Sequence, residues 1–172
     1  MGARSDDWPT VDGLVTSYVD QTFEKLFGKN TTFIRTLSPE RTFWEKATIL
    51  HAEYYRPETQ KRTLRVSRHY YDLHQMHKKG ISDSAMRQIE LFEQVAKHKS
   101  IFFYSSWARY ENAKPGTLRL LPRLEQIPEF KRDYNKMQEM FFTNPPTFDA
   151  IMDSLKELEN KINHMNPDSE QI

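Results

Sequence analysis

The sequence contains no cysteine, only five glycines among 172 residues, and no excess of charge of either sign. The absence of cysteine excludes disulfides, thiol nucleophiles and thiolate metal sites. Lysine and arginine total 25 against 24 aspartates and glutamates, which argues against a strongly basic nucleic-acid coat and against an acidic tail. No apolar run approaches the ~18 residues that a membrane helix needs, and the N-terminal residues lack the apolar segment of a signal peptide. We therefore expect a soluble, cytoplasmic protein without a membrane partner.

Aromatic residues make up 13% of the chain, and its apolar residues recur mostly at helical spacing. The pattern predicts a mainly α fold with at most one or two short strands, built as a single domain over residues 1–172 with flexible ends at 1–10 and 166–172. The run Ser38, Pro39, Glu40 is typical of a helix start. The predicted helices cover residues 11–27, 39–55, 64–79, 82–103 with a break near 99–100, 105–113, 128–142 and 147–165, and the best predicted strand covers 31–37.

The common catalytic signatures are missing from this sequence: it has no phosphate-binding glycine loop, no nucleophile elbow and no His-Glu-x-x-His pair. One candidate for chemistry is Lys46, at the edge of an apolar stripe that includes Phe43, Ala47 and Leu50. A lysine in this position can bury its stem and present its ammonium group to a nucleotide phosphate. The alternative is a lysine that only pairs with a neighbouring acid.

A second candidate is the pair Arg68 and Asp72, which are four residues apart and share one face of a predicted helix. Asp72 would hold a metal ion or orient an attacking hydroxyl while Arg68 grips a phosphate. The alternative is a surface ion pair that contributes only ~0.3–0.5 kcal/mol.

The histidines and the basic clusters carry weaker signals. His69, His74 and His77 scatter around their helix, so a zinc site is not expected. The basic runs 77–79 and 97–99 lie close in sequence to aromatic residues. They would contact RNA phosphates or simply be solvated helix ends.

Several runs of this sequence resemble one known family. They are LSPERTFWEKATILHAEYYRP (37–57), SRHYYDL (67–73), VAKHKSIFF (95–103), WARY (107–110), AKPGTLRL (113–120), Asp133 and Tyr134 with Met137 and 140–142, and GARSDDWP (2–9). Together they cover nearly the whole chain and resemble the abortive-infection nucleotidyltransferase toxins of the AbiEii/AbiGii type.

The resemblance implies a phage-defence toxin that transfers a nucleoside monophosphate from an NTP, with Mg²⁺, onto an acceptor, which in some relatives is tRNA. It also implies an antitoxin partner. Two active-site positions of the family fall on Lys46 and Asp72. By the same resemblance Arg41, Arg68 and His69 are nucleotide- or phosphate-binding candidates.

One departure from the family pattern changes this expectation. The family's core carries a Gly-Ser motif followed by Asp-x-Asp, and no such motif occurs in this chain. Without these carboxylates a two-metal transfer reaction has no metal platform. The chain therefore resembles the C-terminal half of the enzyme, expected to be inactive alone and to use Mg²⁺ and NTP only with an N-terminal partner half.

Two other classes of function stay open on the sequence. Arg68 and His74 have the spacing of the Arg-x(4–6)-His element of small all-α HEPN ribonucleases, in which they would stabilise a phosphate and act in acid–base cleavage. Alternatively, the chain is a non-enzymatic helical module that binds an antitoxin, a partner half or RNA. If a half is missing, we expect an exposed apolar face and, from it, self-association as a homo-oligomer.

Overall fold

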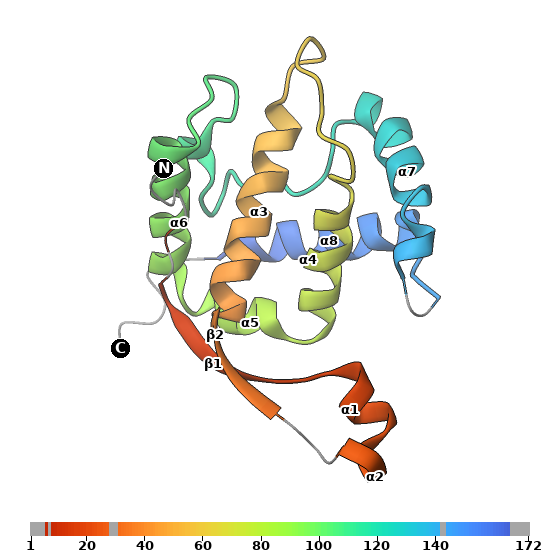
Figure 1. Cartoon of the computed structure of the whole chain (residues 1–172). Coiled ribbons are helices and arrows are strands. Elements are labelled where there is room, and N and C mark those ends of the chain that lie inside the picture. The colour runs from red at the N-terminus through yellow and green to blue at the C-terminus, as the bar shows by residue number, and fades with distance from the viewer. Residues whose placement is uncertain (1–5, 7, 28–30, 142–143, 166–172) are drawn as a thin grey trace. The chain divides into compact units, whose positions relative to one another are not determined.

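The computed structural model describes residues 6, 8–27, 31–141 and 144–165. They divide into two compact units, Met1–Ser38 and Pro39–Ile172. Most residues of the second unit that lie in regular structure are helical, which confirms the predicted mainly α class (Figure 1). The predicted flexible ends lie outside the described residues at 1–5, 7 and 166–172. Within the described part of the chain, no helix is both long and apolar enough to cross a membrane.

The first unit is a two-stranded antiparallel ribbon with two short helices between its strands. Strand β1 (Thr10–Thr16) pairs with β2 (Thr31–Leu37), and α1 (Tyr18–Thr22) and α2 (Glu24–Phe27) lie between them in sequence. The strand predicted at 31–37 is confirmed. The helix predicted at 11–27 is wrong over its first part, which is strand β1, and its second part forms the two short helices α1 and α2. Apolar residues in that segment fit a helical period, but β-branched residues and pairing with β2 favour an extended chain from Thr10 to Thr16.

The second unit is a helical domain in which α3 lies at the centre, with α6 on one side and α4 on the other (Figure 1). Helix α5 also contacts α3, and α8 contacts α4. Its α-helices are α3 (Pro39–Tyr55), α4 (Arg68–Lys78), α5 (Ile81–Met86), α6 (Ile89–Phe102), α7 (Ile127–Asn135) and α8 (Phe148–Asn163), and its 3-10 helices are Tyr110–Asn112, Leu124–Gln126 and Gln138–Met140.

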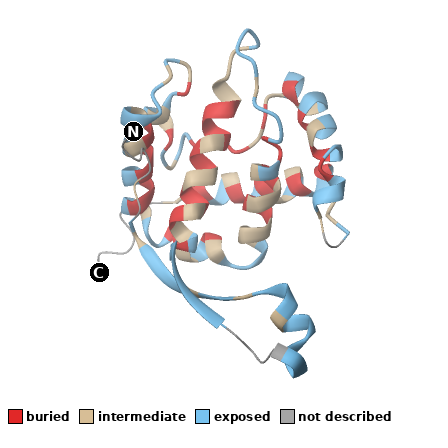
Figure 2. Ribbon diagram, in the orientation of Figure 1, coloured by how far each residue is buried: buried red, intermediate tan, exposed pale blue. Residues whose placement is uncertain are grey.

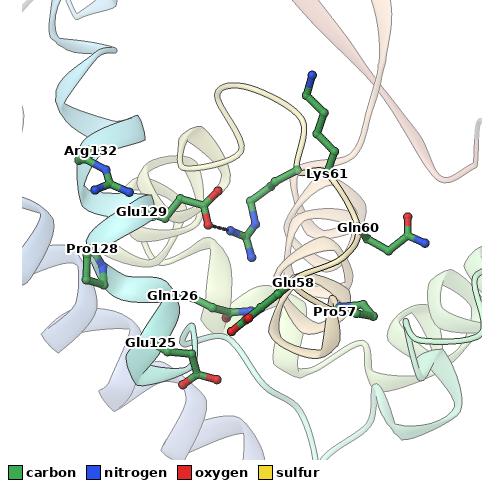
Figure 3. Close-up of a pocket in the computed structure, with 10 residues that line it drawn as sticks. Pro57, Glu58, Gln60, Lys61, Glu125, Gln126, Pro128, Glu129 and Arg132 are labelled. Carbon is green, nitrogen blue, oxygen red and sulfur yellow. Dashed lines mark hydrogen bonds and ion pairs between the residues drawn. The ribbon is translucent and has the colours of Figure 1, made fainter.

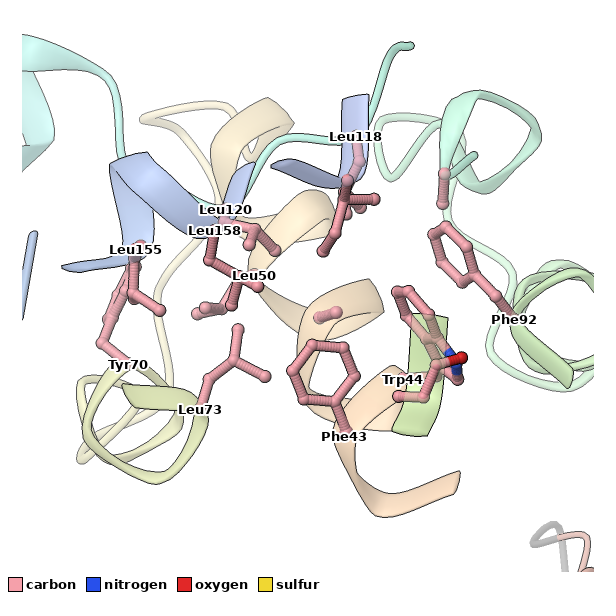
Figure 4. Packing of buried hydrophobic residues seen from close by; sticks show 14 of the residues in the cluster. Phe43, Trp44, Leu50, Tyr70, Leu73, Phe92, Leu118, Leu120, Leu155 and Leu158 are labelled. Atoms are coloured by element: carbon pink, nitrogen blue, oxygen red, sulfur yellow. The ribbon is translucent and has the colours of Figure 1, made fainter. Parts of the chain in front are cut away.

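The apolar core belongs to the second unit, where buried residues line the inner faces of the helices (Figure 2). Trp44 of α3 is fully buried and stacks on Phe92 of α6, with ring centroids 4.1 Å apart. Leu50 and Leu73 pack in the same cluster, together with leucines of α8 (Figure 4). Since α3 is buried on most of its circumference, its polar side chains, Lys46 among them, are at most partly exposed.

Helices α5 and α6 replace the single helix predicted for 82–103, and the break falls at Gln88 rather than near 99–100. In a continuous helix the Ala85 carbonyl would accept a hydrogen bond from the amide four residues later. Here it accepts from the Gln88 amide at 2.9 Å and from the Trp44 indole at 3.2 Å. A tertiary hydrogen bond therefore ends α5 without glycine or proline.

Helix α4 begins later than predicted because a carboxylate from α7 binds the segment before it. Asp133 accepts hydrogen bonds from the Arg65 amide at 2.9 Å, the Ser67 amide at 2.9 Å and the Ser67 hydroxyl at 2.6 Å. Arg65 has a positive φ of 63°, which no α-helix allows. The segment 64–67 therefore forms turns, and α4 starts at Arg68.

The remaining boundaries differ from the predictions at helix ends. The helix predicted for 105–113 is reduced to one 3-10 turn at Tyr110–Asn112, and the one predicted for 128–142 ends at Asn135, followed by Gln138–Met140. The predicted last helix is confirmed as α8, where the Thr147 hydroxyl caps the first turn by accepting from the Ala150 amide at 3.2 Å.

Candidate functional site

The two residues predicted to be catalytic meet in the structure. Lys46 on α3 and Asp72 on α4 are 26 residues apart, and the lysine Nζ donates a hydrogen bond to Asp72 Oδ2 at 2.6 Å. The Lys46 side chain is 21% exposed and that of Asp72 is 36% exposed. The pair therefore lies where the two packed helices reach the surface, within reach of a dissolved ligand.

The predicted partnership of Arg68 and Asp72 is not formed. Arg68 is exposed, and among the described residues no ion pair is recorded for its guanidinium. Asp72 turns to Lys46 on the neighbouring helix instead. Arg68 nevertheless lies one turn before Asp72, so its positive charge is close to the pair.

His69 precedes Asp72 by three residues and lies next to the same charges. Burial, together with the positive charges of Lys46 and Arg68, lowers the pKa of His69 to about 4. Its Nδ1 is buried and has no hydrogen-bond partner among the residues that the structure describes. Since this imidazole is neutral near pH 7, it can offer a phosphate one N–H donor but no charge.

Arg41, the remaining predicted phosphate ligand, lies in an interior ion network. Its side chain is fully buried and donates to Glu45 Oε1 at 3.1 Å. The other oxygen of Glu45 pairs with Lys99 of α6 at 2.5 Å. Because the Arg41 guanidinium has no exposed surface, a phosphate would reach it only after this network opened.

Comparison with known proteins shows to which family the chain belongs. A family model described as "Nucleotidyl transferase AbiEii toxin, Type IV TA system" matches residues 1–154. The chain belongs to the AbiEii family. This confirms the resemblance drawn from the sequence and identifies the chain's relatives as nucleotidyl transferase toxins of type IV toxin–antitoxin systems. No curated protein and no solved structure matches the chain.

The magnesium ion that AbiEii membership implies has no matching donor set in the part of the chain that the structure describes. No group of three or more histidine, aspartate or glutamate side chains comes together there. Asp72 is a single carboxylate, and one of its oxygens is bound by Lys46. Mg²⁺ requires a near-octahedral set of oxygen ligands, and these residues do not provide one.

The geometry does not support the alternative ribonuclease pair. Arg68 and His74 are six residues apart on α4, which places them about 120° apart around the helix axis. His74 is only 6% exposed, whereas Arg68 is exposed. The two side chains therefore face different surroundings, and membership of the AbiEii family favours nucleotidyl transfer.

A polar pocket of about 520 Å³ lies away from this pair, between the 57–62 loop and the start of α7 (Figure 3). Charged side chains of both signs line it: Glu58, Glu125 and Glu129 are acidic, and Lys61 and Arg132 are basic. Arg62 on its wall is bound to both Glu53 and Glu129. Lys46 and Asp72 are not among the lining residues, so this pocket is separate from the candidate site.

Sequence analysis missed a second group of charged and aromatic residues, around the C-terminal end of α3. Arg109 lies over the ring of Tyr55, and Arg119 lies over that of Tyr54. Two features of the sequence could have indicated this group: the adjacent tyrosines at the end of the predicted helix, and the arginines in two of the runs that resemble the family.

Proposed function

We propose that Lys46 and Asp72 are the part of a nucleotidyl-transfer site that this chain contributes. The observation that carries the proposal is their direct contact at 2.6 Å, at a partly exposed position, between helices that are separate in sequence. A partly exposed ion pair contributes only about 0–1 kcal/mol to stability, so stability alone is a weak reason for this arrangement. Membership of the AbiEii family supports the assignment of this chemistry.

The two side chains have complementary roles in the proposed reaction. The Lys46 ammonium has three donor protons, of which Asp72 Oδ2 accepts one, and the others are available to triphosphate oxygens. Asp72 Oδ1 accepts a hydrogen bond from the acceptor hydroxyl and orients it. The hydroxyl oxygen forms a bond to the α-phosphorus, the bond from this phosphorus to the β-phosphate bridging oxygen breaks, and pyrophosphate leaves. The hydroxyl proton passes to Asp72, while Lys46 neutralises charge on the leaving group.

The neighbouring residues of α4 support this pair. Arg68 is exposed one turn before Asp72 and binds an outer phosphate as a cation. His69, with a pKa lowered to about 4 by burial, acts as a neutral hydrogen-bond donor. The carboxylates that bind Mg²⁺ are not among the described residues and are supplied by an N-terminal partner half. The chain alone is therefore inactive. The acceptor is an RNA of the tRNA class, and an antitoxin opposes the activity.

The test measures the transfer of label from each α-³²P-labelled NTP to tRNA in the presence of Mg²⁺. It uses the chain together with the proteins encoded beside it. Lys46→Ala and Asp72→Asn should each lower the rate by about 10²–10³-fold, the range for removal of one group that stabilises transition-state charge. Equal rates for the wild type and both variants would refute the assignment of these residues.

Lys131 and Asp149 provide a matched control. They form another lysine–aspartate pair between two helices, at 2.7 Å, but are more exposed, at 46% and 70%. Lys131→Ala and Asp149→Asn should leave the rate within about twofold, since surface ion pairs contribute little to stability. An equal loss in these variants would mean that any broken ion pair impairs the protein. Transfer by the chain alone would refute the partner half but not the two catalytic assignments.

A second candidate function, an interaction module, is favoured by the ribbon of the first unit. Neither β1 nor β2 contains a buried residue, although Leu14 and Phe33 are 61% and 75% exposed. A two-stranded ribbon is marginally stable by itself in water. We therefore propose that the ribbon binds a partner half or a second copy of the chain, and light scattering at increasing concentration measures the second case.

A further inference from the structure

A buried histidine joins two surface segments that each present an arginine. His51 on α3 is fully buried, and its Nδ1 accepts a hydrogen bond from the Arg119 amide at 3.1 Å. The other nitrogen, Nε2, therefore carries the proton and donates to the Arg109 carbonyl at 3.0 Å. One side chain thus fixes the backbone positions of residues that are ten apart in sequence.

The two arginines lie over the two tyrosines that end α3. The Arg109 guanidinium carbon is 4.9 Å from the centroid of the Tyr55 ring, and that of Arg119 is 5.6 Å from the centroid of Tyr54. The two rings meet edge to face, with centroids 4.9 Å apart. We call these four residues the arginine–tyrosine surface. A guanidinium over the face of a ring makes no hydrogen bond to that ring, so its N–H groups remain able to bind other acceptors.

Both guanidinium groups are available to a ligand. Arg109 is exposed, and no ion pair of its side chain is recorded among the described residues. Arg119 is 47% exposed, and its recorded acidic neighbour, Glu159, is 3.8 Å away. That distance is too long for a hydrogen bond. Arg109 also has a positive φ of 48°, a costly conformation for a non-glycine residue, and its carbonyl is held by His51.

The segment that leads to Arg109 adds exposed rings and further positive charge. From Ala96 to Tyr110 the chain contains no acidic residue. Exposed within it are Phe102 at 49% and Tyr104 at 74%. Paired cations next to exposed aromatic rings are the combination that binds the phosphates and bases of a single strand.

We propose that the arginine–tyrosine surface binds the phosphodiester backbone of an RNA strand, which is the acceptor in nucleotidyl transfer. The identification of this strand as the acceptor rests on the proposed function. Tyr54 lies eight residues after Lys46 on the same helix, which is about 12 Å along its axis. This spacing lets a strand bound at the end of α3 extend toward Lys46 and Asp72.

The test measures binding of a fluorescein-labelled mixed-sequence RNA of about 12 nucleotides by fluorescence anisotropy, without NTP, over a range of salt concentrations. The double variant Arg109→Ala/Arg119→Ala should bind about tenfold or more weakly. Its slope of log K against log salt should be shallower by about 1.4, since each lost contact to a single strand removes about 0.7.

Two variants separate the proposed geometry from net charge and from misfolding. Arg109→Lys/Arg119→Lys should keep the salt slope but bind more weakly than the wild type, because a lysine ammonium neither stacks on an aromatic ring nor donates two parallel hydrogen bonds to a phosphate. Arg87→Ala/Lys156→Ala removes the same charge from exposed positions on other elements and should bind as the wild type does. Circular dichroism shows whether each variant is folded.

Each outcome bears on the proposal. It is overturned if the double alanine variant binds within twofold of the wild type or if the Arg87→Ala/Lys156→Ala control loses as much affinity. Full competition by inorganic phosphate or ATP at equal phosphate concentration would also overturn it, since the site would then bind free phosphate groups. Nucleotide transfer that needs Lys46 but not these arginines refutes this surface alone. RNA binding without any transfer refutes the proposed function alone.

Discussion

His51 should make the stability of the protein depend on pH in the mildly acidic range. Burial lowers the pKa of this side chain to about 4, against 6.5 for an exposed histidine. Protonation would also place a proton on Nδ1, where the Arg119 amide already donates. The folded state therefore excludes a proton that the unfolded chain binds.

The sign and size of the effect follow from this difference. Between pH 6.5 and pH 4 the unfolded state holds more protons, so the free energy of unfolding rises with pH. The contribution of His51 is fully present above pH 6.5 and is lost as the pH falls toward 4. Each pH unit in this window corresponds to about 1.36 kcal/mol, so between pH 7 and pH 5 the loss from His51 is about 2 kcal/mol.

Urea unfolding followed by circular dichroism at pH 7 and pH 5 measures this loss. His51→Gln is the informative variant, because its amide has a donor and an acceptor for the Arg109 carbonyl and the Arg119 amide but does not titrate. Whatever its stability at pH 7, this variant should lose about 2 kcal/mol less than the wild type between the two pH values. Equal losses in the two proteins would refute the assignment of a neutral, buried His51.

Two further predictions concern the start of α4 and the ribbon. Asp133→Ala should lower the free energy of unfolding by about 2 kcal/mol, because the Ser67 and Arg65 amides lose their acceptor. The control Asp149→Ala breaks only an exposed ion pair and should lower it by less than about 1 kcal/mol. Equal losses in urea titrations would contradict the role of Asp133 at the start of α4. Leu14→Lys/Phe33→Lys places charges opposite each other on β1 and β2 and should abolish concentration-dependent self-association in light scattering. A wild type that is monomeric at all concentrations would contradict binding of a second copy at the ribbon.

The pKa of Asp133 fits the same contacts. Burial raises the pKa of this carboxyl, but hydrogen bonds from the Ser67 hydroxyl and from the amides of Ser67 and Arg65 outweigh burial and bring it below its ordinary value. Its contribution to stability is therefore present above the unfolded-state pKa and is lost as the pH falls through the folded-state value. This acid-side loss should disappear in Asp133→Ala.

Local sequence signals were enough to place most of the helices. Pro39 after Ser38 is an ordinary start signal, and α3 begins at Pro39 as predicted. The helix predicted from 147 is α8, which begins at Phe148 with Thr147 as its cap. The same signals failed where a distant partner decides the local structure. Residues 10–16 are extended because they pair with 31–37, and the helix at Gln88 breaks because Trp44 donates to the Ala85 carbonyl.

The candidate site could be predicted residue by residue but not as a pair. Helical spacing put Lys46 beside a core stripe and Asp72 on one face with Arg68. The resemblance to the AbiEii family then favoured a role in the active site for both residues over a role as ordinary surface ion pairs. Spacing on a single helix relates Asp72 only to residues on α4. It therefore suggested Arg68 as the ionic partner, whereas the observed partner is Lys46 on α3.

The contact between Lys46 and Asp72 depends on how far α4 is staggered against α3, and a carboxylate remote from both residues helps to set this stagger. The two helices run in opposite directions side by side (Figure 1). Lys46 lies nine residues before the end of α3, about 14 Å along its axis, and Asp72 lies four residues after the start of α4, about 6 Å. For the two side chains to meet, the segment between the helices must therefore offset the start of α4 from the end of α3 by about 8 Å along the helix axes. Asp133 binds the amides just before Arg68 and so fixes where α4 begins. Because Asp133 follows Asp72 by 61 residues, a helical wheel of either helix cannot reveal that the site depends on it.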